Sequence, residues 1–113
     1  MKRGAAVLLV IALAGCDTRS ETFNTYQEAK RSGLIERGWI PPELPPDATD
    51  IRLRWDLDTN ISEGSYQSKA LVAPTRAGEC QPVAKEPTSI QCETFVFRTE
   101  DGRRTFSNRG RTP

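Results

Sequence analysis

The segment of residues 38–51 constrains the fold most, because it holds four prolines between positions 41 and 46. Proline fixes φ and lacks a backbone donor, so this segment can form neither a helix nor a central strand. Residues that precede proline favour extended geometry, which predicts a stiff polyproline-II path. We therefore expect a proline-rich belt across one face of a sheet, with these apolar side chains turned inward: Trp39, Ile40, Leu44 and Ile51.

The first residues predict export and a lipid anchor. Lys2 and Arg3 precede the apolar run Ala5–Ala14, which suits a signal-peptide core and is shorter than the roughly 20 residues of a membrane span. The run ends in Leu13-Ala14-Gly15-Cys16, which resembles a bacterial lipobox. The resemblance implies a diacylglycerol group on the Cys16 thiol and cleavage before Cys16. The alternative is an ordinary secreted protein in which Cys16 has no such role.

The lipoprotein interpretation divides the chain into four parts. Residues 1–15 are the signal peptide, residues 16–22 the lipidated cysteine with a short tether, residues 23–107 one globular domain, and residues 108–113 a flexible tail. The expected location is the bacterial cell membrane, with the domain on the extracytoplasmic side. Asp17 resembles an inner-membrane retention signal of enteric-type lipoproteins and favours that membrane.

Charge and composition argue against several functions. Loss of Lys2 and Arg3 with the signal peptide leaves 14 basic against 15 acidic side chains, so the domain has no general electrostatic reason to bind nucleic acid. The chain contains no histidine, which excludes a Ser-His or Cys-His catalytic base. It also has no glycine-rich phosphate loop. We therefore expect no enzyme and no cofactor.

Two cysteines remain after Cys16. Cys80 and Cys92 belong to an exported domain, where disulfides form, so we predict a bridge between them. The alternatives are two free thiols or a metal pair. Without histidine, two thiols make a poor zinc site, and no metal is expected.

One helix is expected from Thr25 to Ser32, because Thr25-x-x-Glu28 has capping-box spacing and Gly33 can end the helix. The clearest strand follows the prolines. One of its faces would carry Ile51, Leu53, Trp55 and Leu57, and the other Arg52, Arg54, Asp56 and Asp58.

The remaining segments complete a small sheet. A second extended segment is expected at residues 65–73, a loop closed by the disulfide at residues 75–91, and a β-hairpin from residues 94–98 and 103–106. The predicted fold class is α+β: one short helix and a proline-rich belt packed on an antiparallel sheet of about three to five strands.

Several short motifs resemble one family. The segments Arg37-Gly38-Trp39-Ile40-Pro41, Leu44-Pro45, Ala48-x-x-Ile51 and Asp56-x-Asp58-Thr59-Asn60 are similar to a signature of small bacterial lipoproteins with a YbbD-type head domain. The similarity covers roughly residues 23–72, and it departs from the pattern at Arg54-Trp55. It implies a lipoprotein with one compact domain, and it implies no reaction or ligand.

Asp56 and Asp58 allow two chemical interpretations. The pattern D-x-D-x-N opens a calcium loop, but Ile61 and Gln67 stand where that loop needs glycine and glutamate. As a catalytic pair, carboxylates two residues apart on a strand lie about 7 Å apart, within the range of inverting glycosidases. Two acids on one strand point in parallel, however, so we expect a solvated strand face and a turn.

The leading hypothesis is a non-enzymatic envelope lipoprotein that binds a protein or wall component near the membrane. Its candidate binding surface comprises Trp39, Arg52, Arg54, Asp56 and Asp58. The alternatives are a small wall-glycan hydrolase that uses Asp56 and Asp58, and a passive structural lipoprotein. Basic residues near the C-terminus could contact an acidic partner, although a solvated hairpin explains them as well.

Overall fold

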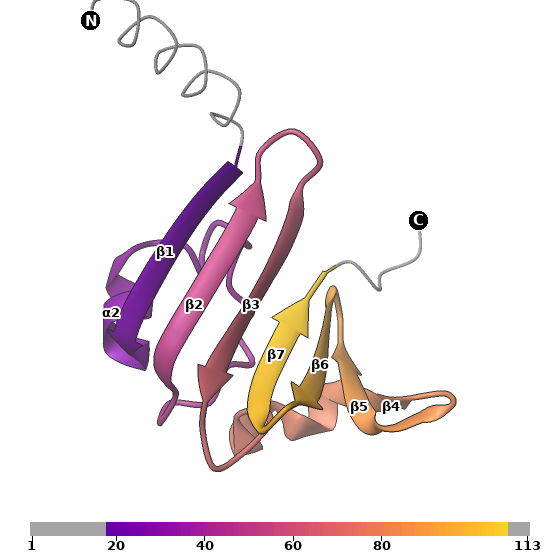
Figure 1. Ribbon diagram of the computed structural model, residues 1–113. Coiled ribbons are helices and arrows are strands. Elements are labelled where there is room, and N and C mark those ends of the chain that lie inside the picture. The colour runs from indigo at the N-terminus through magenta and orange to yellow at the C-terminus, as the bar shows by residue number, and fades with distance from the viewer. Residues whose placement is uncertain (1–17, 109–113) are drawn as a thin grey trace, which may run out of the picture.

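The computed structural model describes residues 18–108 (Figure 1). The predicted signal peptide, Cys16, Asp17 and most of the predicted tail lie outside the described residues. In chain order the elements are β1 (Thr18–Thr25), α2 (Tyr26–Arg31), β2 (Thr49–Asp56), β3 (Ile61–Gln67), the 3-10 helix η1 (Pro74–Glu79), β4 (Cys80–Val83), β5 (Glu86–Cys92), β6 (Phe95–Glu100) and β7 (Arg103–Ser107).

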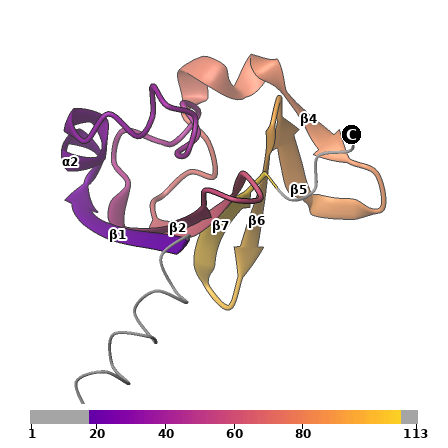
Figure 2. The same ribbon diagram turned by 90° about the horizontal axis from the view of Figure 1, so that it is seen from above.

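The predicted α+β class is wrong, because the fold is dominated by one antiparallel sheet of seven strands with a single short α-helix between residues 18 and 108. The strand order is β1-β2-β3-β7-β6-β5-β4. The sheet bends, and α2, the proline-rich segment and η1 all lie on its inner side (Figure 2). The opposite side of the sheet, its outer face, has no covering element among the described residues.

Part of the predicted tether belongs to the sheet. Residues 18–22 begin the edge strand β1, which pairs with β2 from Thr18 opposite Asp56 to Thr25 opposite Thr49. Phe23 is the single buried residue of β1. An edge strand with one buried side chain has no period-two hydrophobic pattern, so its sequence is indistinguishable from that of a polar linker.

The predicted loop at residues 75–91 is also wrong. Residues 75–91 contain most of η1 and most of the hairpin β4–β5, in which Cys80 lies directly opposite Cys92. The predicted disulfide joins these two residues and so crosses the hairpin. Pro82 is tolerated within β4 because β4 is an edge strand of the sheet.

The proline-rich segment forms turns and not a polyproline-II belt. The Leu44 amide donates to the Pro41 carbonyl at 3.3 Å, and the Ala48 amide donates to the Pro45 carbonyl at 3.1 Å. In each turn a proline occupies the second position, where its fixed φ suits a type I or II turn. The expected inward side chains Ile40, Leu44 and Ile51 are buried, whereas Trp39 is partly exposed.

The short helix begins as predicted. The Thr25 hydroxyl accepts a hydrogen bond from the Glu28 amide at 3.2 Å, and the Glu28 carboxylate accepts one from the Asn24 amide at 3.0 Å. Gly33 follows the helix with φ of 84°, a left-handed conformation that suits glycine. Ala29 packs the helix against the core.

Aromatic rings fill the core at the centre of the sheet. The Tyr66 ring lies 6.1 Å from the Phe106 ring and 6.5 Å from the Phe97 ring, measured between centroids. All three side chains are buried. One carboxyl group is buried as well, and burial raises the pKa of Glu43, whose Oε1 atom has no hydrogen-bond partner among the described residues.

Gly64 makes the close contact between β3 and the Phe106 ring possible. A Cβ atom at this position would collide with the Arg52 carbonyl oxygen and with the Phe106 ring. We expect Gly64→Ala to lower the free energy of unfolding by about 1–3 kcal/mol, because backbone and ring must both move. Urea denaturation of the Cys16→Ser form without residues 1–15 measures this. Gly78→Ala, where the new Cβ meets no atom within 4 Å, is the matched control. Equal losses in both variants would contradict the packing argument.

Candidate functional site

The outer face of the sheet carries a hollow with a volume of about 640 Å³. Strand alternation directs polar side chains from five neighbouring strands into it. These side chains are Ser20 and Thr22 of β1, Arg52 and Arg54 of β2, Glu63 and Ser65 of β3, Thr105 and Ser107 of β7, and Arg98 and Glu100 of β6. The hollow therefore combines both charge signs with hydroxyl groups.

Strand register arranges these side chains in rows. Arg54 lies opposite Ser20 on one side and opposite Glu63 on the other. Arg52 lies between Thr22 and Ser65 in the same way. Directly opposed side chains on antiparallel strands have Cβ atoms about 5 Å apart, so each arginine stands among groups that can share a ligand with it.

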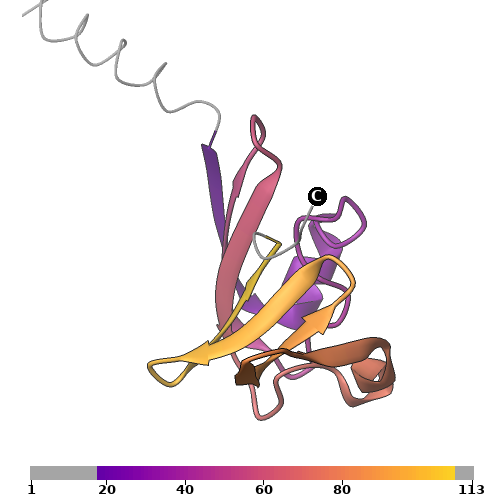
Figure 3. The ribbon, with the colours of Figure 1, turned by 90° about the vertical axis from the view of Figure 1, so that its right-hand side faces the viewer.

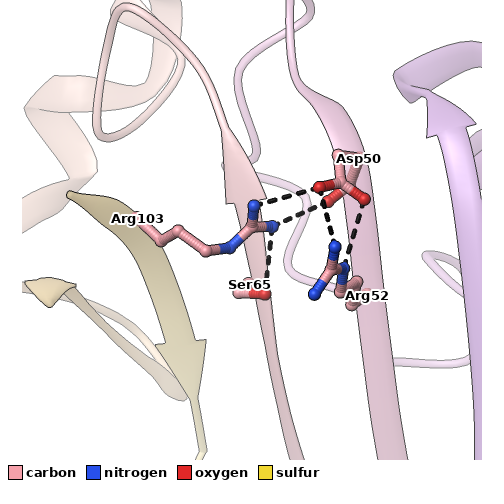
Figure 4. Close-up of polar contacts among 4 residues, drawn as sticks. All are labelled: Asp50, Arg52, Ser65 and Arg103. Carbon is pink, nitrogen blue, oxygen red and sulfur yellow. Dashed lines mark hydrogen bonds and ion pairs between the residues drawn. The ribbon is translucent and has the colours of Figure 1, made fainter. Parts of the chain in front are cut away.

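A β-bulge at the start of β2 organises one end of the hollow. The register of β2 against β3 shifts between Thr49 and Arg52, and Asp50 lies there with φ of 48°. Aspartate visits this left-handed region more readily than most residues. Its carboxylate accepts hydrogen bonds from Arg52 at 3.2 Å and from Arg103 at 3.0 Å. Figure 4 shows Arg103 reaching across β3, where it also donates to the Ser65 hydroxyl at 3.1 Å.

These contacts fix the charge of Asp50. The hydrogen bond from Arg52, followed by that from Arg103, holds the pKa of the Asp50 carboxyl below its usual range. The two arginines thus keep a carboxylate between them, and Arg103 links β7 to β2 across the intervening strand. This link ties together three of the strands that form the hollow.

A second ion pair fixes the other side of the hollow. The Arg98 Nε atom donates to Glu86 Oε1 at 3.0 Å, and the Ser89 hydroxyl donates to the same oxygen at 3.1 Å. Arg98 first, and then Ser89, lower the pKa of the Glu86 carboxyl. Arg54 differs from these arginines, because its exposed side chain makes no ion pair or hydrogen bond within residues 18–108.

The structure separates the residues of the predicted binding surface. Arg52 and Arg54 lie together in the hollow, but Trp39 packs on the inner side against Trp55, with ring centroids 6.1 Å apart. Because Trp55 and Arg54 are neighbours on one strand, they project from opposite faces. Trp39 therefore shares no surface with the two arginines.

Asp56 and Asp58 occupy the end of β2 and the turn that follows it. The Asp56 Oδ1 atom accepts hydrogen bonds from the Asp58 amide at 2.8 Å and from the Thr59 amide at 3.4 Å. Asp58 is exposed in the turn. Asp56 also borders a smaller hollow of about 270 Å³ beside Arg54 and Thr18. Asp56 therefore stabilises the turn between β2 and β3.

Residues 18–108 show neither a metal-binding cluster nor a membrane-spanning helix. These residues contain no group of three or more His, Cys, Asp or Glu side chains placed to hold a metal ion. None of their helices has the length and apolar character needed to cross a bilayer.

Sequence reasoning missed Asp50, Arg98, Thr105 and Ser65 as members of this face. Arg98 and Arg103 are among the basic residues near the C-terminus, which the sequence relates only to an acidic partner or a solvated hairpin. The sequence predicts the hairpin, but it does not show that the hairpin pairs with β3. Without that register, the sequence cannot place Arg98 and Arg52 on one surface.

Comparisons with known proteins identify one domain. Residues 17–67 match the family model described as the YbbD head domain. The matched region contains β1, α2, β2 and β3. No curated protein and no solved structure shows significant similarity to the chain.

Asp50→Asn tests the carboxylate between the two arginines. Asparagine also tolerates a left-handed backbone, so the change removes mainly the charge. We expect a lower melting temperature at pH 7, and a difference from the unchanged protein that shrinks in acid. The reason is that a carboxyl with a depressed pKa stabilises the fold above its unfolded pKa, and this stability is lost as pH falls through the folded pKa. Asp58→Asn in the exposed turn is the control. Identical melting curves for both variants at pH 7 would show that Asp50 has no such role.

Proposed function

From the premise that residues 17–67 form a YbbD-type head domain, we propose that this chain is a bacterial envelope lipoprotein whose outer sheet face binds a polar envelope component. In this proposal, lipid on Cys16 holds the domain at the extracytoplasmic surface of the membrane. The protein acts by binding and not by catalysis.

The observation that carries the proposal is the hollow on the outer face. Its volume of about 640 Å³ lies within the range of about 300–1,000 Å³ found for ligand sites. Arg52 and Arg54 come from the YbbD-type region, whereas Arg98 and Thr105 come from the strands that follow it. The site is thus complete only when both parts of the chain have folded together.

The chemistry of the lining defines the class of ligand. Three arginines, two glutamates on the same face and several hydroxyl groups suit a polar ligand that carries carboxylates together with amino or hydroxyl groups. Phe106, the one aromatic residue of the lining, is 1% exposed, so the ligand would be held by polar contacts and not by stacking on a ring. Wall fragments and polar segments of envelope proteins have this chemistry.

The position of β1 supports binding close to the bilayer. The strand begins at Thr18, two residues after Cys16, and two extended residues span at most about 7 Å. Ser20 and Thr22 of the same strand line the hollow. A ligand in the hollow would therefore lie beside the membrane surface.

The geometry gives the wall-glycan hydrolase little support. A catalytic carboxylate must face its substrate, whereas Asp56 uses its Oδ1 atom to hold the amides of its own turn. The passive structural alternative differs from the proposal in one testable respect. It expects that no substitution on the outer face changes what the protein contacts in the cell.

Crosslinking in intact cells, followed by capture and mass spectrometry, tests the proposal. We expect Arg54→Ser to reduce recovery of the bound component by about ten-fold, in line with a charged hydrogen bond of roughly 1.5 kcal/mol. Gln81→Ser, an exposed change on the opposite edge strand, should leave recovery unchanged. Cys16→Ser should abolish recovery by releasing the domain from the membrane. Equal recovery from the Arg54 and Gln81 variants would contradict a role for this face.

A further inference from the structure

We propose that the end of the sheet nearest the predicted anchor is a membrane-contact surface, in which Leu57, Trp39 and Trp55 enter the interface of the bilayer. This inference rests on the lipid anchor proposed above. It concerns a different surface from the polar hollow, and it names the lipid interface itself as the occupant.

Leu57 is the first observation. Among residues 18–108 it is the most exposed large hydrophobic side chain, with 46% of its surface accessible. It lies at the start of the turn between β2 and β3, which projects from the end of the sheet (Figure 3). The turn is fixed by Asp56, which accepts hydrogen bonds from the amides of Asp58, Thr59 and Asn60. A rigid turn thus presents an apolar side chain to the surroundings.

The two tryptophans are the second observation, because both lie at this end. Trp55 pairs with Arg19 of β1 and with Ser62 of β3, one position before the strand ends at Asp56. The Trp39 carbonyl accepts a hydrogen bond from the Ser62 hydroxyl, which holds Trp39 beside Trp55. Both side chains are partly exposed. Tryptophan favours the boundary between lipid tails and headgroups, since its ring is apolar and its N–H is polar.

The entry point of the chain is the third observation. Thr18 starts β1 opposite Asp56, so the chain enters the sheet beside the β2–β3 turn (Figure 1). Two residues from Cys16 to Thr18 reach at most about 7 Å, whereas each headgroup layer is roughly 5–7 Å thick. Acyl chains on Cys16 would place this residue at the bilayer surface. The tether is then about as long as the headgroup layer is thick, so the end of the sheet would stay at the headgroups.

Charge at this end also suits a lipid surface. Arg19 of β1 lies opposite Trp55, where its cation can meet headgroup phosphates. Asp58 is exposed next to Leu57, which disfavours a strongly anionic membrane. Zwitterionic phosphatidylcholine is therefore the appropriate probe.

Tryptophan fluorescence reads this contact directly, because the chain contains two tryptophans and both lie at the proposed surface. The acylated mature protein, which begins at Cys16, is placed in phosphatidylcholine vesicles with bromine on the acyl chains near the headgroup. Its emission is compared with that in unbrominated vesicles. We expect bromine to quench the emission strongly. Leu57→Asp should remove about half of the quenching or more, since a charge opposes entry into the interface. Leu57→Ser is a milder second variant, and Gln81→Asp on the opposite edge strand is the control.

Flotation of the same vesicles tests the lipid anchor independently of the membrane-contact surface. If the unchanged protein does not float and carries no lipid by mass spectrometry, the proposed anchor is wrong, and this inference fails with it. If it floats but bromine does not quench its emission, the anchor stands and the contact surface is refuted. Quenching that is equal in the unchanged protein and in both folded Leu57 variants would refute the role of Leu57.

Discussion

The pairing of β3 with β7 is the constraint on which the rest of this structure depends. It is the one ladder within residues 18–108 that joins the strands β1–β3 to the strands β4–β7, and it extends from Glu63 opposite Ser107 to Tyr66 opposite Arg104. On the inner side the Tyr66 and Phe106 rings meet across this ladder, and Gly64 leaves room for the contact. On the outer side Arg103 crosses it to reach Asp50. The core and the hollow therefore form together or not at all.

The YbbD-type region supplies only part of this arrangement. The match ends at residue 67, where β3 ends, so the region includes the strand that forms the junction but not its partner β7. The buried rings Phe97 and Phe106 come from the later strands, as do Arg98 and Thr105 of the hollow. The disulfide fixes the hairpin β4–β5 at the far edge of the sheet. The C-terminal strands thus complete both the fold and the proposed binding face.

The sequence predicted the features that depend on residues close together in the chain. The cap formed by Thr25 and Glu28, the alternating strand before Asp56 and the disulfide are all present. The sequence did not predict the edge strands β1 and β4, because they bury few side chains and so show no alternation of apolar and polar residues. The successive prolines suggested an extended belt, although proline at the second position of a turn equally fits two turns in succession. Trp39 was grouped with the arginines because nothing in the sequence indicates which face of the sheet a distant turn will cover.

Site-specific photo-crosslinking in intact cells tests the central claim, that the outer face is the binding surface. A photoreactive residue is placed at Thr22, Ser65 or Thr105 in the hollow, and for comparison at Glu36, Pro42 or Pro46, which are exposed in the turns on the inner side of the sheet. The account predicts that irradiation yields adducts to the same envelope component from the first three positions and none from the others. Adducts that arise only from the inner side would contradict it.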